Sequence, residues 1–187
     1  MKLEQIEKCV KEVLSEKRFY HSICVMKRCE ELAKIFNVNI EKAKKIGIAH
    51  DIAKEMSADE KINYVHKHNL IIDDVEEQNK GLLHSKIGAH ICKEKFGFSE
   101  DMVKAVEAHT TGKENMDLLA KILYMADATG EDRKWNNLDY VKNLILENID
   151  NAMLYMLDMT IKENIEKNRL IHIDTIRVRN QIIANMT

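Results

Sequence analysis

The feature that most restricts the fold of this chain is its lack of helix-breaking residues. Proline is absent, and glycine occurs only 6 times in 187 residues. Lys, Glu, Leu, Ile, Ala and Met, which favour helices, are abundant instead. A chain of this length is long enough to bury a core of its own. We therefore predict an all-α protein, a compact bundle of about eight helices that occupies residues 1–187 as a single domain.

The spacing of apolar residues and the positions of caps locate the individual helices. Helices are predicted over residues 2–14, 21–36, 40–54, 57–69, 84–96, 99–109, 117–128 and 150–168, with a short terminal helix capped by Asp174. Ser57 followed by Glu60 resembles a capping box, and Gly97 is a typical helix stop. The polar stretches 70–83 and 129–137 are predicted to be irregular connections.

Charge and composition exclude several classes of protein. The 29 Lys and Arg against 31 Asp and Glu give a net charge of −2, which excludes a general electrostatic attraction to nucleic acid or to an anionic membrane. No uncharged stretch approaches the roughly 20 residues of a membrane-spanning helix. The 4 cysteines form no CxxC pair, as is typical of reduced thiols. We predict a cytoplasmic protein without nucleic acid or membrane partners, and a homodimer remains open.

The informative residues are polar side chains inside apolar helical segments. His50 and Asp51 lie within IGIAHDIA, and Asp127 interrupts LLAKILYMADAT. An ionised carboxylate on an apolar helix face is costly unless it is paired or binds a cation. Because His21 also lies at the start of an apolar stripe, a divalent metal shared by these residues is the simplest explanation.

Each of these residues also has a purely structural alternative. A single histidine on an apolar face is usually a core residue bonded to the backbone, and an aspartate at a helix end is more often a cap. Lys54 could be a solvated residue at a helix end. His84 and His109 could likewise be caps or core residues. The joint occurrence of histidines and carboxylates on separate helices favours a site over four independent explanations.

Several short motifs occur in a defined order and resemble a known family. They are RFYH at 18–21, AHDIAK at 49–54, LLHS at 82–85, AHTTG at 108–112 and MAD at 125–127, followed by Arg133. Together they resemble the HD-domain metal-dependent phosphohydrolases, and among these the YqeK-type symmetrical bis(5′-nucleosyl)-tetraphosphatases, which split diadenosine tetraphosphate into two ADP. The resemblance implies an HD-type helical bundle with its motifs in residues 15–135. The helices of residues 138–187 would then close the nucleotide site.

The resemblance also implies a role for each matching residue. The metal ligands would be His21, His50, Asp51 and Asp127. The catalytic residues would be Asp51, Lys54 and His84. The nucleotide would be bound by Arg18, Lys54, His84, His109, Thr110 and Arg133, together with His172, Thr175 and Arg177 near the end of the chain.

The donor set restricts the metal and the reaction. Two imidazoles and two carboxylates suit Fe, Mn or Zn, and the absence of thiolates argues against a structural zinc site. The family metal implied by the resemblance is iron. Metal-activated water would attack a phosphorus, and a nucleoside diphosphate, ADP or GDP, would leave. Whether one or two ions bind remains open, since His84 and His109 could complete a second site.

Two departures from the family pattern leave open how the site binds the nucleoside of the substrate. The family usually reads ADKIEP where this chain has ADATGED before Arg133, and it often has His-Pro where this chain has His172-Ile173. An alternative enzyme is an HD phosphohydrolase of nucleoside monophosphates or of guanosine-based or cyclic signalling nucleotides. An alternative outside the enzymes is a non-catalytic nucleotide-binding HD module.

Overall fold

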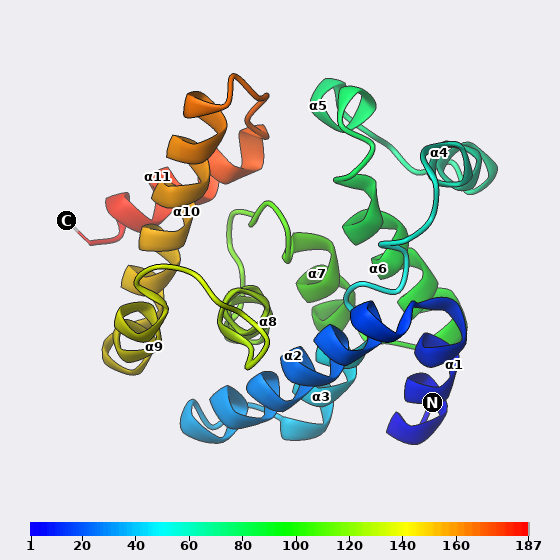
Figure 1. The fold of residues 1–187 in the computed structure, drawn as a ribbon, viewed down its shortest axis with the longest axis horizontal. Helices are drawn as coiled ribbons and strands as arrows, with labels where there is room; N and C mark the ends of the chain where they lie inside the picture. The colour runs from blue at the N-terminus through cyan, green and yellow to red at the C-terminus, as the bar shows by residue number, and fades with distance from the viewer. Residues whose placement is uncertain (187) are drawn as a thin grey trace.

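The structure, a computed structural model, describes residues 1–186, and these form eleven α-helices without a strand (Figure 1). The helices are α1 (Leu3–Val13), α2 (Glu16–Ile35), α3 (Ile40–Ala49), α4 (Ala58–Lys67), α5 (Asp74–Gln78), α6 (Leu83–Phe96), α7 (Glu100–Ala108), α8 (Leu118–Thr129), α9 (Leu138–Glu147), α10 (Ile149–Glu166) and α11 (Ile173–Ala184). The predicted all-α class is confirmed, and so are the capping box at Ser57 and the left-handed stop at Gly97.

Two helices are additional to those predicted, and both have weak sequence signals. α5 has only five residues and is started by Asp73, whose side chain accepts hydrogen bonds from Val75 N and Glu76 N. α9 buries only Val141 and Ile145, a stripe too narrow to stand out among polar residues. The sequence prediction missed α5 because it is a single capped turn, and missed α9 because its buried stripe is narrow, so the predicted number of helices was too low.

One predicted helix end is wrong, and the difference lies at the proposed site. α3 ends at Ala49, whereas the sequence predicted a helix to Lys54. After Ala49 the backbone continues in tighter turns, with Ile52 N bonded to Ala49 O and Lys54 N bonded to Asp51 O. His50 and Asp51 therefore lie in a bend of the backbone, not in a helix, and both side chains are buried.

The main core lies where α2, α3 and α8 pack together, around Leu32, Ile46 and Leu123. The approach of α3 to α2 is very close at Gly47: a side-chain Cβ there would lie 2.7 Å from the Cα atom of Met26. Only glycine fits this contact without movement of the backbone, so Gly47 sets the distance between α2, which carries His21, and α3, which ends just before His50.

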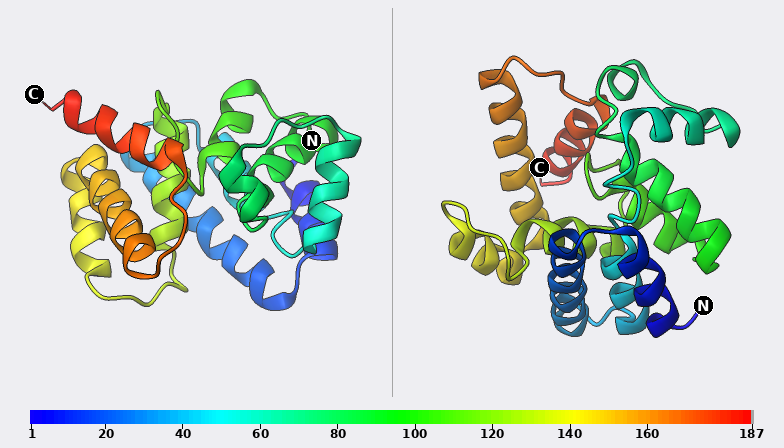
Figure 2. Two further views of the ribbon diagram at one scale, coloured as in Figure 1. Left: turned by 90° about the horizontal axis from the view of Figure 1, so that it is seen from above. Right: turned by 45° about the vertical axis from the view of Figure 1, so that its right-hand side comes forward.

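The last three helices form a layer of their own at one side of the bundle (Figures 1 and 2). α10 packs against α9, α11 and α8, so α8 connects this layer to the rest. The start of α11 also reaches the turn after α7, where Thr175 Oγ1 donates to Thr111 O at 2.9 Å. Among residues 1–186 no helix is both long enough and apolar enough to cross a bilayer.

Candidate metal centre

Four buried histidines from four parts of the chain meet in the interior. His21 comes from α2, His50 follows α3, His84 lies in the first turn of α6 and His109 follows α7. Their ring centres form a row, with 5.4 Å from His21 to His50, 5.0 Å from His50 to His109 and 5.0 Å from His109 to His84. The fold therefore brings together side chains that the sequence separates widely.

The two predicted aspartates lie among these rings. Asp127 Oδ1 is 3.0 Å from His21 Nε2 and 4.0 Å from His50 Nε2. Asp51 Oδ2 is 3.5 Å from His50 Nε2, and Asp51 Oδ1 is 3.2 Å from His84 Nε2. Two groups of donor atoms are close enough to share a cation: His21, His50 and Asp127, and the adjoining group of His50, Asp51 and His109.

Unpaired atoms at the centre of the row test whether these residues fit a metal. Within the described residues, His50 Nε2 and Asp51 Oδ1 are buried and have no hydrogen-bond partner. Buried polar atoms are nearly always paired, and an unpaired one costs stability. An imidazole nitrogen and a carboxylate oxygen are ligands that divalent transition metals accept. The residues therefore fit the divalent metal that the sequence predicts.

Three of the histidines are held in a defined tautomer by their own backbone. The Nδ1 atoms of His50, His84 and His109 lie 2.6–2.8 Å from the carbonyl oxygens three residues earlier. Because a carbonyl can only accept, each Nδ1 carries the proton. When these rings are neutral, each Nε2 therefore presents its lone pair to the centre of the row, as metal ligation requires.

Three cationic side chains surround the centre. Arg18 Nη1 donates to Asp51 Oδ2 at 3.0 Å, and Lys54 Nζ lies 3.7 Å from Asp51 Oδ1 and 3.1 Å from His84 Nε2. Arg133 binds the carboxylate of Asp127, and its Nε donates to the Asp127 carbonyl at 2.7 Å. All three side chains are about one third exposed, so they connect the buried centre with solvent.

The surroundings keep both carboxylates ionised. Burial alone would raise the pKa of Asp51, but the His50, His109 and His84 imidazoles outweigh it and hold this pKa well below its usual range. For Asp127 burial is likewise outweighed, by the nearby His21, His50 and Arg133, so its pKa is also lowered. Both side chains are thus available as anionic ligands.

His84 is kept neutral. Burial lowers the pKa of His84 to about 4. The neutral ring accepts the contact from the Lys54 ammonium at Nε2, because its Nδ1 proton is given to Gly81 O. Thr110 Oγ1 lies 3.2 Å from Nε2 of both His84 and His109, so Thr110 also belongs to this end of the row.

A cavity of about 540 Å³ opens beside the His21 end of the row. It lies between the start of α2 and the segment after α8, and three of its side chains are cationic. The lining residues are Ser15, Lys17, Arg18, Tyr20, His21, Glu55, Asp132 and Arg133. The cavity therefore joins solvent to His21, and its wall carries three cations and the carboxylates of Glu55 and Asp132.

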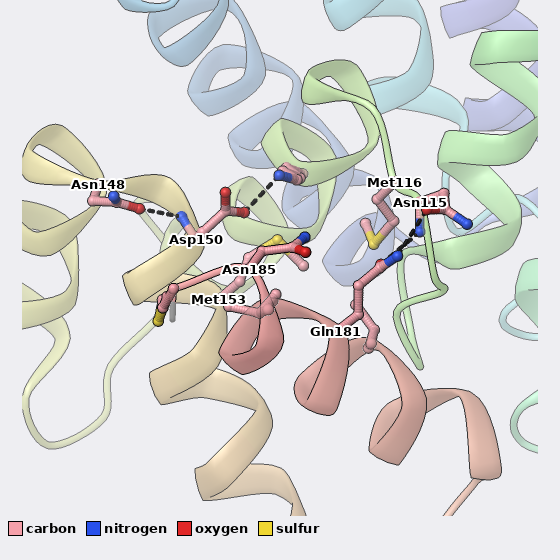
Figure 3. Close-up of a pocket in the computed structure, with 11 residues that line it drawn as sticks. Asn115, Met116, Asn148, Asp150, Met153, Gln181 and Asn185 are labelled. Atoms are coloured by element: carbon pink, nitrogen blue, oxygen red, sulfur yellow. Dashed lines mark hydrogen bonds and ion pairs between the residues drawn. The ribbon is translucent and has the colours of Figure 1, made fainter.

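A second cavity, of about 470 Å³, lies away from this centre between α8, α10 and α11 (Figure 3). Its polar side chains are largely engaged with one another. Gln181 Nε2 donates to Asn115 Oδ1 at 2.7 Å, and Lys121 Nζ lies 2.6 Å from Asp150 Oδ1. It contains none of the predicted site residues.

Three predicted nucleotide contacts lie apart from the row of histidines. His172 Nε2 contacts Asp73 Oδ2 at 2.7 Å, Thr175 binds the carbonyl of Thr111, and Arg177 is exposed beside Asp174. His172 rather than Asp174 also caps α11, by accepting from Asp174 N. A role for His172, Thr175 and Arg177 in nucleotide binding stays a prediction.

One side chain that contacts the row was not singled out from the sequence. Asp132 Oδ2 lies 2.8 Å from His21 Nδ1. The residue falls in the segment before Arg133 where the chain departs from the family pattern, and that departure was the only sequence signal. Its partner is 111 positions earlier in the chain, so the pairing depends on the fold.

Comparisons with known proteins agree with this geometry. The HD domain family model matches residues 18–132. The symmetrical bis(5′-nucleosyl)-tetraphosphatase of Halalkalibacterium halodurans is 33% identical over 93% of each chain, and that of Bacillus subtilis is 29% identical over 98% of this chain and 99% of the relative.

A solved structure shows the same fold. The crystal structure of a predicted HD superfamily hydrolase involved in NAD metabolism, from Clostridium acetobutylicum, is 34% identical and superposes with a TM-score of 0.95 over 99% of this chain and 98% of that chain. The motifs, the row of histidines and these relatives agree: the chain belongs to the HD-domain family and, within it, to the family of the symmetrical bis(5′-nucleosyl)-tetraphosphatases.

Proposed function

We propose that the chain hydrolyses dinucleoside tetraphosphates symmetrically, with diadenosine tetraphosphate as its substrate and two ADP as products. Relatives that cover nearly the whole chain carry the name of this activity. The observation that carries the proposal is a pair of buried atoms without a hydrogen bond among the described residues, His50 Nε2 and Asp51 Oδ1, beside three cations.

His21, His50, Asp51 and Asp127 would hold the metal, with iron as the first choice and Mn or Zn as alternatives. Their donor atoms are imidazole Nε2 and carboxylate oxygens, which suit these metals. When bound, such a metal polarises a phosphoryl oxygen and lowers the pKa of a bound water. His109 adjoins the same group, so the donor set could accommodate one ion or two.

Arg18, Lys54 and Arg133 would bind the polyphosphate. In the structure each of them contacts Asp51 or Asp127. A cation held by these carboxylates would compete with those ion pairs and free the three side chains for phosphate oxygens. Arginine matches phosphate in a bidentate geometry, and a lysine adds a point charge. Their charge would stabilise the transition state and the leaving diphosphate.

The arrangement of these cations supports cleavage in the middle of a tetraphosphate. Arg133 lies at the His21 end of the row, and Lys54 lies at the His84 end. A phosphate chain that crosses the centre would therefore meet a cation on each side of the attacked phosphorus. The cavity beside His21 could accommodate one nucleoside. We keep the closing role of residues 138–187, and placement in the cytoplasm, as further predictions.

Product analysis tests the proposal. The protein, purified with its metal, would be incubated with diadenosine tetraphosphate, and the products would be separated by chromatography. ADP as the single product is expected. Equal amounts of ATP and AMP would contradict symmetric cleavage. Turnover only of nucleoside monophosphates, or of guanosine-based or cyclic nucleotides, would favour another HD phosphohydrolase, and binding without any product would favour a non-catalytic module.

A further inference from the structure

His21 differs from the other three histidines of the row in the group that binds its Nδ1 atom. His50 and His109 follow helix ends and His84 lies in a first turn, where a carbonyl three residues earlier is accessible to the ring. His21 lies within α2, where backbone carbonyls are used by the helix. Its Nδ1 faces a carboxylate instead, Asp132 Oδ2, at 2.8 Å.

Two neighbouring residues hold both sides of the contact between His21 and Asp127. The chain makes a tight turn after α8, with Arg133 N bonded to Gly130 O at 3.0 Å. From this turn Asp132 reaches the far nitrogen of His21, while Arg133 binds the carboxylate of Asp127. The turn therefore fixes the orientation of two proposed ligands at once.

The contacts of His21 define its tautomer. Arg133 Nη2 lies 3.3 Å from His21 Nε2, and a guanidinium can only donate. Asp132 Oδ2 can only accept, so Nδ1 carries the proton of that contact, and in the neutral ring Nε2 is then the acceptor. This leaves the lone pair of Nε2 directed toward Asp127 and Arg133, on the side where a metal would bind.

We propose that Asp132 is a positioning residue of the metal centre, whose carboxylate holds His21 with its Nε2 lone pair facing the cation. The inference rests on the metal centre of the proposed function and is independent of the substrate. A carboxylate that accepts from the far nitrogen of a metal-binding histidine fixes the ring and makes it a stronger ligand. Asp132 is suited to this because its side chain is only 20% exposed, and Oδ2 is committed to His21.

A purely structural ion pair would have a different consequence. If Asp132 served only to join the turn to α2, its loss would lower the stability of the metal-free protein and leave the affinity of the folded protein for metal unchanged. A positioning role predicts the reverse pattern in the isosteric variant Asp132→Asn, which keeps an oxygen acceptor and removes the charge. Metal affinity then falls while the fold is preserved.

Cobalt binding tests the inference without any substrate. Chelator-treated wild type, Asp132→Asn and Asp132→Ala would be titrated with Co²⁺, and both the affinity and the visible spectrum of the bound ion would be recorded. We expect about a 10–100-fold weaker affinity for Asp132→Ala, a smaller loss for Asp132→Asn, and a changed spectrum in both. Glu131→Gln is the matched control, because Glu131 is the exposed neighbour of Asp132, and it should bind as the wild type does.

Thermal unfolding of the metal-free proteins accompanies each titration. Wild-type affinity and spectrum in folded Asp132→Asn and Asp132→Ala would overturn the inference. A wild type that binds no Co²⁺ would overturn the metal centre and this inference together. A wild type that binds Co²⁺, loses affinity when Asp132 is changed and yet fails to cleave diadenosine tetraphosphate would support the inference and overturn only the proposed substrate.

Discussion

His21 Nε2 lies 3.0 Å from Asp127 Oδ1, a contact that joins the second turn of α2 to the last turn of α8. The same carboxylate is bound by Arg133. An imidazole that presents its lone pair and a carboxylate would repel each other without a positive charge between or beside them, and here the guanidinium supplies it. A divalent cation would supply the same charge more strongly, so we expect metal and Arg133 to compete for Asp127.

Replacement of Asp127 by asparagine should remove both metal and activity. The variant keeps the shape of the side chain but loses the anionic ligand that His21 and Arg133 surround. We expect at least about a 100-fold fall in metal affinity and a comparable loss of turnover. Elemental analysis and product chromatography measure the two effects. Asp158→Asn, at a surface pair with Arg179, is the control, and full activity in Asp127→Asn would contradict the assignment.

Replacement of Lys54 by methionine should slow the reaction without removing the metal. Lys54 contacts Asp51 and His84 but is expected to act on phosphate. The loss of one group that stabilises transition-state charge typically costs about 100–1000-fold in kcat. Lys167→Met, at a surface pair with Glu163, should behave as the wild type. An unchanged kcat in Lys54→Met would show that this cation has no part in catalysis.

The metal-free protein should lose stability as the pH falls from about 6.5 to 4. His84 has a pKa of about 4 in the folded protein, below the usual value near 6.5 in the unfolded chain. Between these values the unfolded chain binds a proton that the folded protein excludes, so acid favours unfolding, and the loss levels off below pH 4. This difference corresponds to roughly 3 kcal/mol.

Urea unfolding in the presence of a chelator, at several pH values, measures this effect. Other groups also titrate in this range, so the comparison is between the wild type and His84→Asn. The variant should lose about 3 kcal/mol less than the wild type between pH 7 and pH 4. Identical pH profiles for the two proteins would show that His84 does not resist protonation.

Replacement of Gly47 by alanine should destabilise the fold. The added Cβ would lie 2.7 Å from Met26 Cα and 3.2 Å from Cys29 Sγ, so α2 and α3 would have to separate. Overpacking of this kind costs about 1–3 kcal/mol. In Gly81→Ala the added Cβ meets only the end of the Asn79 side chain, so this control should be close to the wild type. Equal free energies of unfolding for both variants would contradict the close contact.

The sequence predicts most of the fold because most helices begin or end at recognisable capping residues. Ser57 with Glu60 and Gly97 mark ends that the structure confirms. The end of α3 is different. Its apolar pattern continues past Ala49, but the backbone turns there so that His50 and Asp51 reach the interior. Periodicity reports which residues are buried, and it does not distinguish a helix from a bend that buries the same residues.

The candidate site shows the same limit. The motifs containing His21, His50-Asp51 and Asp127 are visible in the sequence because polar residues interrupt apolar stripes. Asp132 lies in a polar segment where one more carboxylate carries no signal, and only the turn after α8 brings it to His21. The pairing of His172 with Asp73 likewise depends on how the C-terminal layer packs.

Anomalous diffraction from crystals of the protein grown with Mn²⁺ tests the central claim most directly. We predict a strong anomalous peak from a Mn²⁺ ion within bonding distance of His21, His50, Asp51 and Asp127. Among the described residues a separate group of possible ligands, Asp73, Glu76 and His172, serves as an internal comparison. A peak only at that group, or none among the four predicted ligands at saturating Mn²⁺, would contradict the account.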